Sequence, residues 1–73
     1  MYSFSEGGLD LTIWKDPNGT EMMLTSHNEL WGRFNSAMDA VGHAALVLRE
    51  EGRSVDLVEK ASDLSNWQSG TQV

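Results

Sequence analysis

The 73-residue sequence contains no cysteine, one proline and two histidines. Without cysteine the chain can form neither a disulfide nor a thiolate metal site. No apolar run approaches the roughly 20 residues needed to cross a bilayer. Residues 1–8 have neither the basic nor the apolar segment of a secretory signal. These absences predict a cytoplasmic protein without cofactors and without membrane contact.

Positive charge is also scarce, since 11 acidic residues outnumber five basic ones and the net charge is −6. The basic side chains are spread along the chain, which disfavours direct binding to nucleic-acid phosphates. The acidic side chains are scattered as well, apart from Glu50 and Glu51. We interpret the charge mainly as a source of solubility, with attraction to a basic partner or mimicry of nucleic acid as alternatives.

The length suffices for one small domain. Hydrophobic residues make up 40% of the sequence, which is typical of a globular chain. The Ser- and Gly-rich residues 1–8 predict a flexible lead-in, residues 9–61 a single α+β domain, and the mostly polar residues 62–73 a flexible tail.

Residues 9–25 carry the pattern of an antiparallel β-hairpin. Apolar and polar residues alternate over most of the segment from Leu9 to Lys15, and a second extended segment follows at residues 20–25. Between them, Asp16-Pro17-Asn18-Gly19 has the residue types of a type I turn closed by a glycine bulge. The hairpin is therefore predicted from its turn as well as from its strands.

The predicted turn implies a register for the two strands. The expected pairs are Asp16 with Thr20, Lys15 with Glu21, Trp14 with Met22, Ile13 with Met23, and Thr12 with Leu24. One face then carries Leu9, Leu11, Ile13 and Met23, and we expect this face to form the core. The other carries Trp14, Met22 and Leu24.

A single long amphipathic helix is predicted for residues 27–51. Ser26 and Glu29 have the spacing of a capping box, and Gly52 suits a left-handed helix end. Apolar residues recur every three or four positions, at Leu30, Phe34, Ala37, Met38, Val41, Ala45 and Leu48. Glu50 and Glu51 fall near the helix C-terminus, where the dipole disfavours acids, and a basic partner would explain their position.

Residues 53–60 are compatible with two structures. In a strand, Val55 and Leu57 would share a face. In a helix, Ser54 would be the cap, and Leu57, Val58, Ala61 and Leu64 would form a stripe. We favour a third strand, because a two-stranded hairpin is marginal alone. The predicted fold is therefore α+β with a ββαβ order and flexible tails.

Catalytic motifs are missing from the sequence: it has no nucleophile elbow, no glycine-rich phosphate loop and no HExxH. Asp39 and His43 are spaced as a helical surface pair rather than as an acid–base dyad, and His27 is interpreted as a solvated side chain. We therefore expect a non-enzymatic protein with no catalytic, metal or cofactor residues.

The predicted partner-binding residues are Trp14, Met22, Leu24 and Trp31. One helix covers only one sheet face, so the opposite face would expose the first three, while Trp31 lies beside the apolar helix stripe. Trp is favoured as an interface anchor and Met adapts to uneven partners. The alternative is that Phe4 or Trp67 covers this face from the terminal segments.

In size, acidity and plan, with Asp16-Pro17-Asn18-Gly19 followed by the segment from Ser26 to Gly52, the chain resembles small phage-encoded proteins that take over host machinery. The resemblance implies a protein in the host cytoplasm that binds host RNA polymerase, inhibits transcription initiation or promotes antitermination, and does not bind nucleic acid directly. An anti-CRISPR-like inhibitor or acidic nucleic-acid mimic is the alternative. No family residue is transferred to this sequence, because the likeness lies in size and general character.

Overall fold

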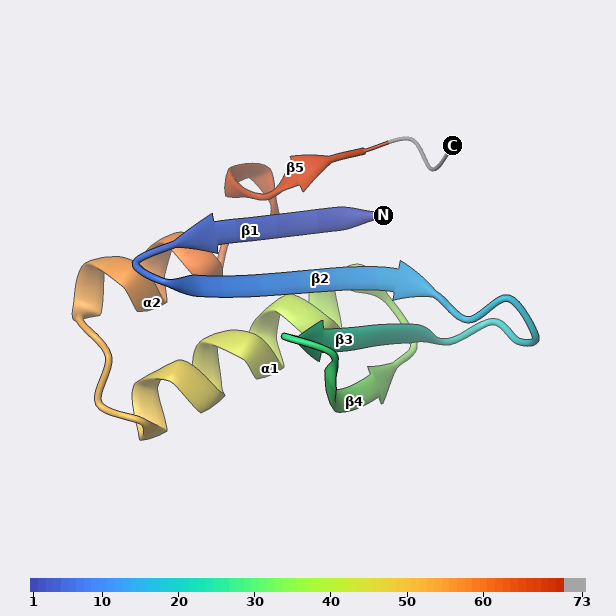
Figure 1. Ribbon diagram of the computed structural model, residues 1–73, viewed down its shortest axis with the longest axis horizontal. Coiled ribbons are helices and arrows are strands. Elements are labelled where there is room, and N and C mark those ends of the chain that lie inside the picture. The colour runs from blue at the N-terminus through green and yellow to red at the C-terminus, as the bar shows by residue number, and fades with distance from the viewer. Residues whose placement is uncertain (71–73) are drawn as a thin grey trace.

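The computed structural model describes residues 1–70 as one antiparallel sheet with helices on one side (Figure 1). The elements are β1 (Tyr2–Glu6), β2 (Leu9–Lys15), β3 (Met22–Ser26), β4 (Glu29–Phe34), α1 (Ala37–Glu50), α2 (Val55–Ala61), the 3-10 helix η1 (Leu64–Asn66) and β5 (Gln68–Ser69). The strand order is β4-β3-β2-β1-β5. The predicted α+β class is confirmed, whereas the ββαβ layout with one long helix is only partly matched.

The N-terminal residues form β1, where the sequence predicted a flexible lead-in. Gly7 and Gly8 connect β1 to β2 with φ values of 61° and 80°, which glycine adopts without steric cost. In the resulting hairpin Phe4 lies opposite Leu11, and both side chains are buried. The first residues thus contribute a strand and a core aromatic ring.

The predicted hairpin between β2 and β3 is present, but its register is shifted by one residue. Trp14 pairs with Met23, and Ile13 pairs with Leu24. The Asp16 N–H donates to the Glu21 carbonyl at 2.9 Å, so the loop comprises residues 17–20 instead of 17–19. Because side chains alternate along a strand, this shift moves every β3 side chain to the opposite face from the one predicted.

A tight turn at His27 and Asn28 replaces the expected start of the helix. Both residues have positive φ, 50° and 70°, as a two-residue type I′ hairpin requires. Ser26 pairs with Glu29, and the chain returns as β4 beside β3, with a register irregularity between Leu24 and Thr25. The predicted helix start at residue 27 is therefore wrong, and the Ser26–Glu29 spacing belongs to a hairpin.

Helix α1 begins at Ala37, where the Ser36 hydroxyl caps it by accepting the Asp39 N–H at 3.2 Å. After Gly52, whose φ is 79°, a second helix follows instead of the favoured third strand. The Ser54 hydroxyl caps α2 by accepting the Leu57 N–H at 3.2 Å, as the alternative interpretation required. The four strands that precede this segment already pair with one another in the sheet, and the segment packs on α1.

Much of the predicted C-terminal tail is ordered into η1 and β5. Trp67 is buried, and its indole N–H donates to the Ala61 carbonyl at 3.0 Å. Its ring lies 5.4 Å from that of Phe4, between centroids. Strand β5 pairs with β1, and the Gly70 N–H donates to the Met1 carbonyl at 2.8 Å. Residues 71–73 of the predicted tail lie outside the described part of the chain.

Candidate protein-binding surface

The β-sheet has two unlike faces. The face toward the helices, called the covered face, carries Phe4, Leu9, Leu11, Ile13, Met22 and Leu24, most of them in the core. Within residues 1–70 no helix lies on the other face, called the open face (Figure 1). The pairings place Ser3, Ser5, Asp10, Thr12, Trp14, Met23, Thr25, Leu30 and Arg33 there.

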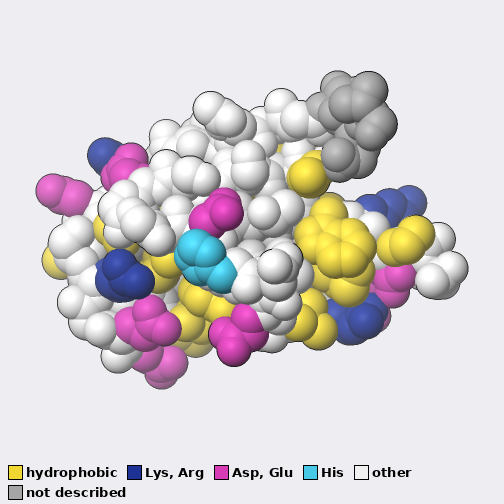
Figure 2. Space-filling model, viewed as in Figure 1, with side chains coloured by type: hydrophobic (Ala, Val, Ile, Leu, Met, Phe, Trp, Pro, Cys, Tyr) yellow, Lys and Arg dark blue, Asp and Glu magenta, His cyan; other side chains and the backbone are white. Residues whose placement is uncertain are grey.

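Apolar side chains gather at one end of the open face, where Figure 2 shows a yellow cluster beside basic and acidic groups. We define the Trp14 patch as Trp14, Met23 and Leu30, which come from β2, β3 and β4. Trp14 is 36% exposed and Leu30 50% exposed, while Met23 is buried beside its cross-strand partner Trp14. An adjoining hollow of about 400 Å³ is lined by Met1, Thr12, Trp14, Thr25 and Asn28.

The β2–β3 loop beside this patch is held in place by the Asp16 carboxylate. One oxygen accepts the Asn18 N–H at 2.9 Å, and the other accepts Nη1 of Arg33 at 2.8 Å. The Asn18 hydrogen bond and then the Arg33 guanidinium lower the pKa of Asp16 below its ordinary value. Since Arg33 lies on β4 opposite Met23, it ties the loop to the far edge of the patch.

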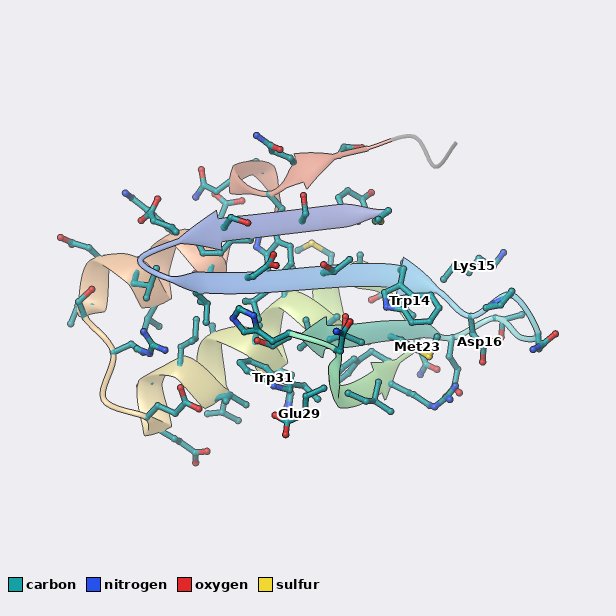
Figure 3. The ribbon with its side chains drawn as sticks, viewed as in Figure 1. Trp14, Lys15, Asp16, Met23, Glu29 and Trp31 are labelled. Carbon is teal, nitrogen blue, oxygen red and sulfur yellow. The ribbon has the colours of Figure 1, made fainter. Side chains whose placement is uncertain are left out.

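Of the four predicted binding residues, Trp14 lies on the open face as expected and points away from the helices (Figure 3). Met22 and Leu24 lie on the covered face instead, where Leu24 is fully buried. The one-residue register shift causes both corrections. Trp31 is a half-buried residue of β4 that packs against the core, not a helical residue. The structure therefore does not bring the four side chains together.

Two residues of the patch escaped the sequence analysis. Met23 was expected in the core face of the hairpin, and Leu30 in the helix stripe. Their positions follow from the loop length and from the turn at His27 and Asn28. One feature of the sequence could have predicted this turn. Asparagine tolerates positive φ, and Asn28 is followed by a segment that can pair with β3.

The described residues contain no group of three or more His, Cys, Asp or Glu side chains placed to hold a metal ion. Over the same part of the chain, none of the helices has the length and apolar character needed to span a membrane.

Comparison with known proteins finds no matching family model, no matching curated protein and no matching solved structure.

Proposed function

We propose that this chain is a non-enzymatic regulator that binds a protein partner through the Trp14 patch. The observation that carries the proposal is a Trp side chain exposed on an uncovered sheet face, next to apolar neighbours and a salt-bridged loop. Trp is enriched at interface hot spots, and apolar patches rimmed by polar groups are typical of protein contacts.

The partner that we propose to test first is host RNA polymerase. This choice comes from the resemblance to phage host-takeover proteins, which also implies a site of action in the host cytoplasm and an effect on initiation or antitermination. The open face supports binding to a protein surface because it offers three adjacent strands as a firm platform. Affinity would then come mainly from the apolar area of the Trp14 patch that the partner covers, rather than from charge.

The distribution of charge favours this mode over mimicry of nucleic acid. Mimicry requires a dense stripe of acids, whereas the face in Figure 2 shows carboxylates in small separate groups that are mixed with basic side chains. Several are also neutralised in ion pairs, among them Asp16 with Arg33 and Glu6 with Lys60. We therefore expect binding to persist at about 0.5 M salt, where charged contacts are strongly screened.

The test is binding of the immobilised protein to purified bacterial RNA polymerase, core and holoenzyme, with Trp14→Ala as the patch variant. Met38→Ala is the matched control, since Met38 is an apolar side chain that is 64% exposed on α1, away from the patch. We expect Trp14→Ala to weaken binding by about 30-fold or more, as for a hot spot, and Met38→Ala to leave it unchanged. If both variants bound as tightly as the wild type, the Trp14 patch would not be the binding surface. If the wild type bound neither form of the polymerase, RNA polymerase would not be the partner.

A further inference from the structure

A second hollow lies away from the Trp14 patch, where the turns after β1 and β3 approach the C-terminal end of α1. Its volume is about 360 Å³, and its lining residues are Gly8, Leu9, Ser26, His27, Glu29, Trp31, Glu51 and Arg53. We propose that this hollow, called the α1-end recess, binds the side chain of an arginine on a protein partner. The identity of the guest as part of a protein rests on the proposed function, whereas its chemistry follows from the recess.

The charges around the recess favour a cation. Glu29 and Glu51 supply two carboxylates against the single guanidinium of Arg53. Glu51 is also the C-cap of α1, where the unpaired carbonyl groups add negative partial charge. Arg53 Nε lies 3.6 Å from Glu51 Oε1, and both side chains are well exposed, so this internal pair is weak and replaceable.

A largely buried serine whose hydroxyl has no hydrogen-bond partner provides a second sign of a guest. Ser26 is only 7% exposed and lies on the covered face opposite Leu11. It lines the recess, and its hydroxyl takes part in none of the side-chain hydrogen bonds among residues 1–70. Among residues 1–70 no buried side-chain nitrogen or oxygen lacks a partner, so the unbonded Ser26 oxygen is in contact with solvent. The Ser26 oxygen is therefore free to accept a hydrogen bond from a bound group.

Trp31 decides which cation fits best. Figure 3 shows Trp31 and Glu29 near each other on β4, apart from Trp14. The Trp31 ring is half-buried, and an arginine guanidinium can stack on such a ring while its N–H groups donate to carboxylates and to a hydroxyl. A lysine ammonium has no plane to stack and fewer donors. The recess therefore suits arginine better than lysine.

The probe for this site is N-acetyl-arginine amide, titrated into the isotope-labelled full chain by NMR. We expect saturable shifts of the Trp31 indole N–H and of the Ser26 and Glu51 amides. N-acetyl-citrulline amide is the uncharged control of similar shape and should cause no saturable shift, and N-acetyl-lysine amide should bind more weakly. An equal response to citrulline, a tighter response to lysine, or no saturable shift with arginine would each overturn the proposal.

Variants then test the charge argument. Glu29→Gln and Glu51→Gln should each weaken arginine binding by about twofold to fivefold, the range of a partly exposed ion pair. Glu50→Gln is the matched control, since it removes the same charge one position away and Glu50 does not line the recess. Arg53→Gln should strengthen binding by a similar factor, because it removes the competing internal guanidinium. Weaker binding of N-acetyl-arginine amide by Arg53→Gln would show that the Arg53 guanidinium does not compete with the bound arginine, and would overturn the proposal.

The two binding sites can fail separately. Trp14→Ala should leave the affinity for N-acetyl-arginine amide unchanged, because Trp14 does not line the recess. If N-acetyl-arginine amide binds the recess but the protein does not bind RNA polymerase, the arginine site is supported and the proposed partner is rejected. If Trp14→Ala abolishes arginine binding, the recess is not the site.

Discussion

The covered and open faces of the sheet bury apolar side chains in different ways. On the covered face Leu11, Ile13 and Leu24 are fully buried beneath helices that come from later in the chain. On the open face Met23 is buried by neighbouring side chains of the sheet, and Trp14 beside it remains partly exposed. Burial alone therefore does not identify the core. A residue buried beneath the helices stabilises the fold, whereas a residue buried only by its neighbours in the sheet still belongs to a surface that a partner can contact.

The largest effect on stability is expected for Trp67, which packs into the core beneath the covered face. Trp67→Ala removes a buried ring that contacts Phe4 and should cost about 3–5 kcal/mol of unfolding free energy. A domain of this size has roughly 3–5 kcal/mol in total, so urea titration should find it largely unfolded.

Trp67→Phe is the milder companion variant. It retains an aromatic ring but leaves the Ala61 carbonyl without its indole donor, so the loss should be smaller, about 1–3 kcal/mol. A loss below about 0.5 kcal/mol for Trp67→Ala would mean that the covered face is complete without this residue.

The next effect separates the two faces within one strand. Leu24→Ala opens a cavity on the covered face and should cost about 2–5 kcal/mol in a urea titration. Thr25→Ala, one position along β3 on the open face, should stay within about 0.5 kcal/mol of the wild type. If Thr25→Ala were the more damaging variant, the register that places Met23 on the open face would be incorrect.

Trp14→Ala should have a smaller effect on stability than either core variant. It removes a cross-strand contact with Met23, and such pairs contribute roughly 0.2–1 kcal/mol. Thermal unfolding followed by circular dichroism measures this loss. A collapse of the fold comparable to that of Leu24→Ala would show that Trp14 belongs to a second core and is not available as an anchor.

The smallest effect concerns the acid dependence of the β2–β3 loop. The hydrogen bonds from Asn18 and Arg33 depress the pKa of Asp16 in the folded state below the ordinary 3.8. A depressed carboxyl pKa contributes stability above pH 3.8, and this contribution is lost as the pH falls through the lower folded value. Unfolding free energies measured between pH 5 and about pH 2.5 should fall less steeply for Asp16→Asn than for the wild type. Identical slopes would show that Asp16 makes no such contribution.

The sequence predicted the β2–β3 hairpin because its turn residues act locally, through the φ of Pro17 and the carboxylate of Asp16. It could not predict the register, since Asp16-Pro17-Asn18-Gly19 is compatible with loops of three and of four residues. That single residue exchanges the faces of Met22 and Met23. The position of Trp14 on the open face was predicted correctly because Trp14 lies before the turn, where the loop length has no effect.

The start of the helix was mispredicted because the same residues fit two structures. Ser26 and Glu29 match a capping box, and Leu30 and Phe34 are spaced by one helical turn. A strand pairing with β3 satisfies the backbone of residues 29–34 equally well. It needs positive φ at His27 and Asn28, which is uncommon for residues other than glycine and gives no clear signal in the sequence. For residues 53–60 the choice depended on tertiary packing, since Leu57 and Ala61 are buried only once α1 is in place.

The strand order also has a consequence for how quickly the parts assemble. The strands β1 to β4 follow one another in the sheet and are joined by short loops. Their pairing therefore costs little loop-closure entropy. Tyr2 and Ser69 pair across nearly the whole sequence, and that contact carries the largest closure entropy in the sheet. In refolding, the four-stranded meander should therefore form before β5 docks. A fluorine label on Trp67 should report its burial later than a label on Trp14 reports formation of the β2–β3 hairpin. Residues 64–69 would then be the last described part of the chain to pack against the rest.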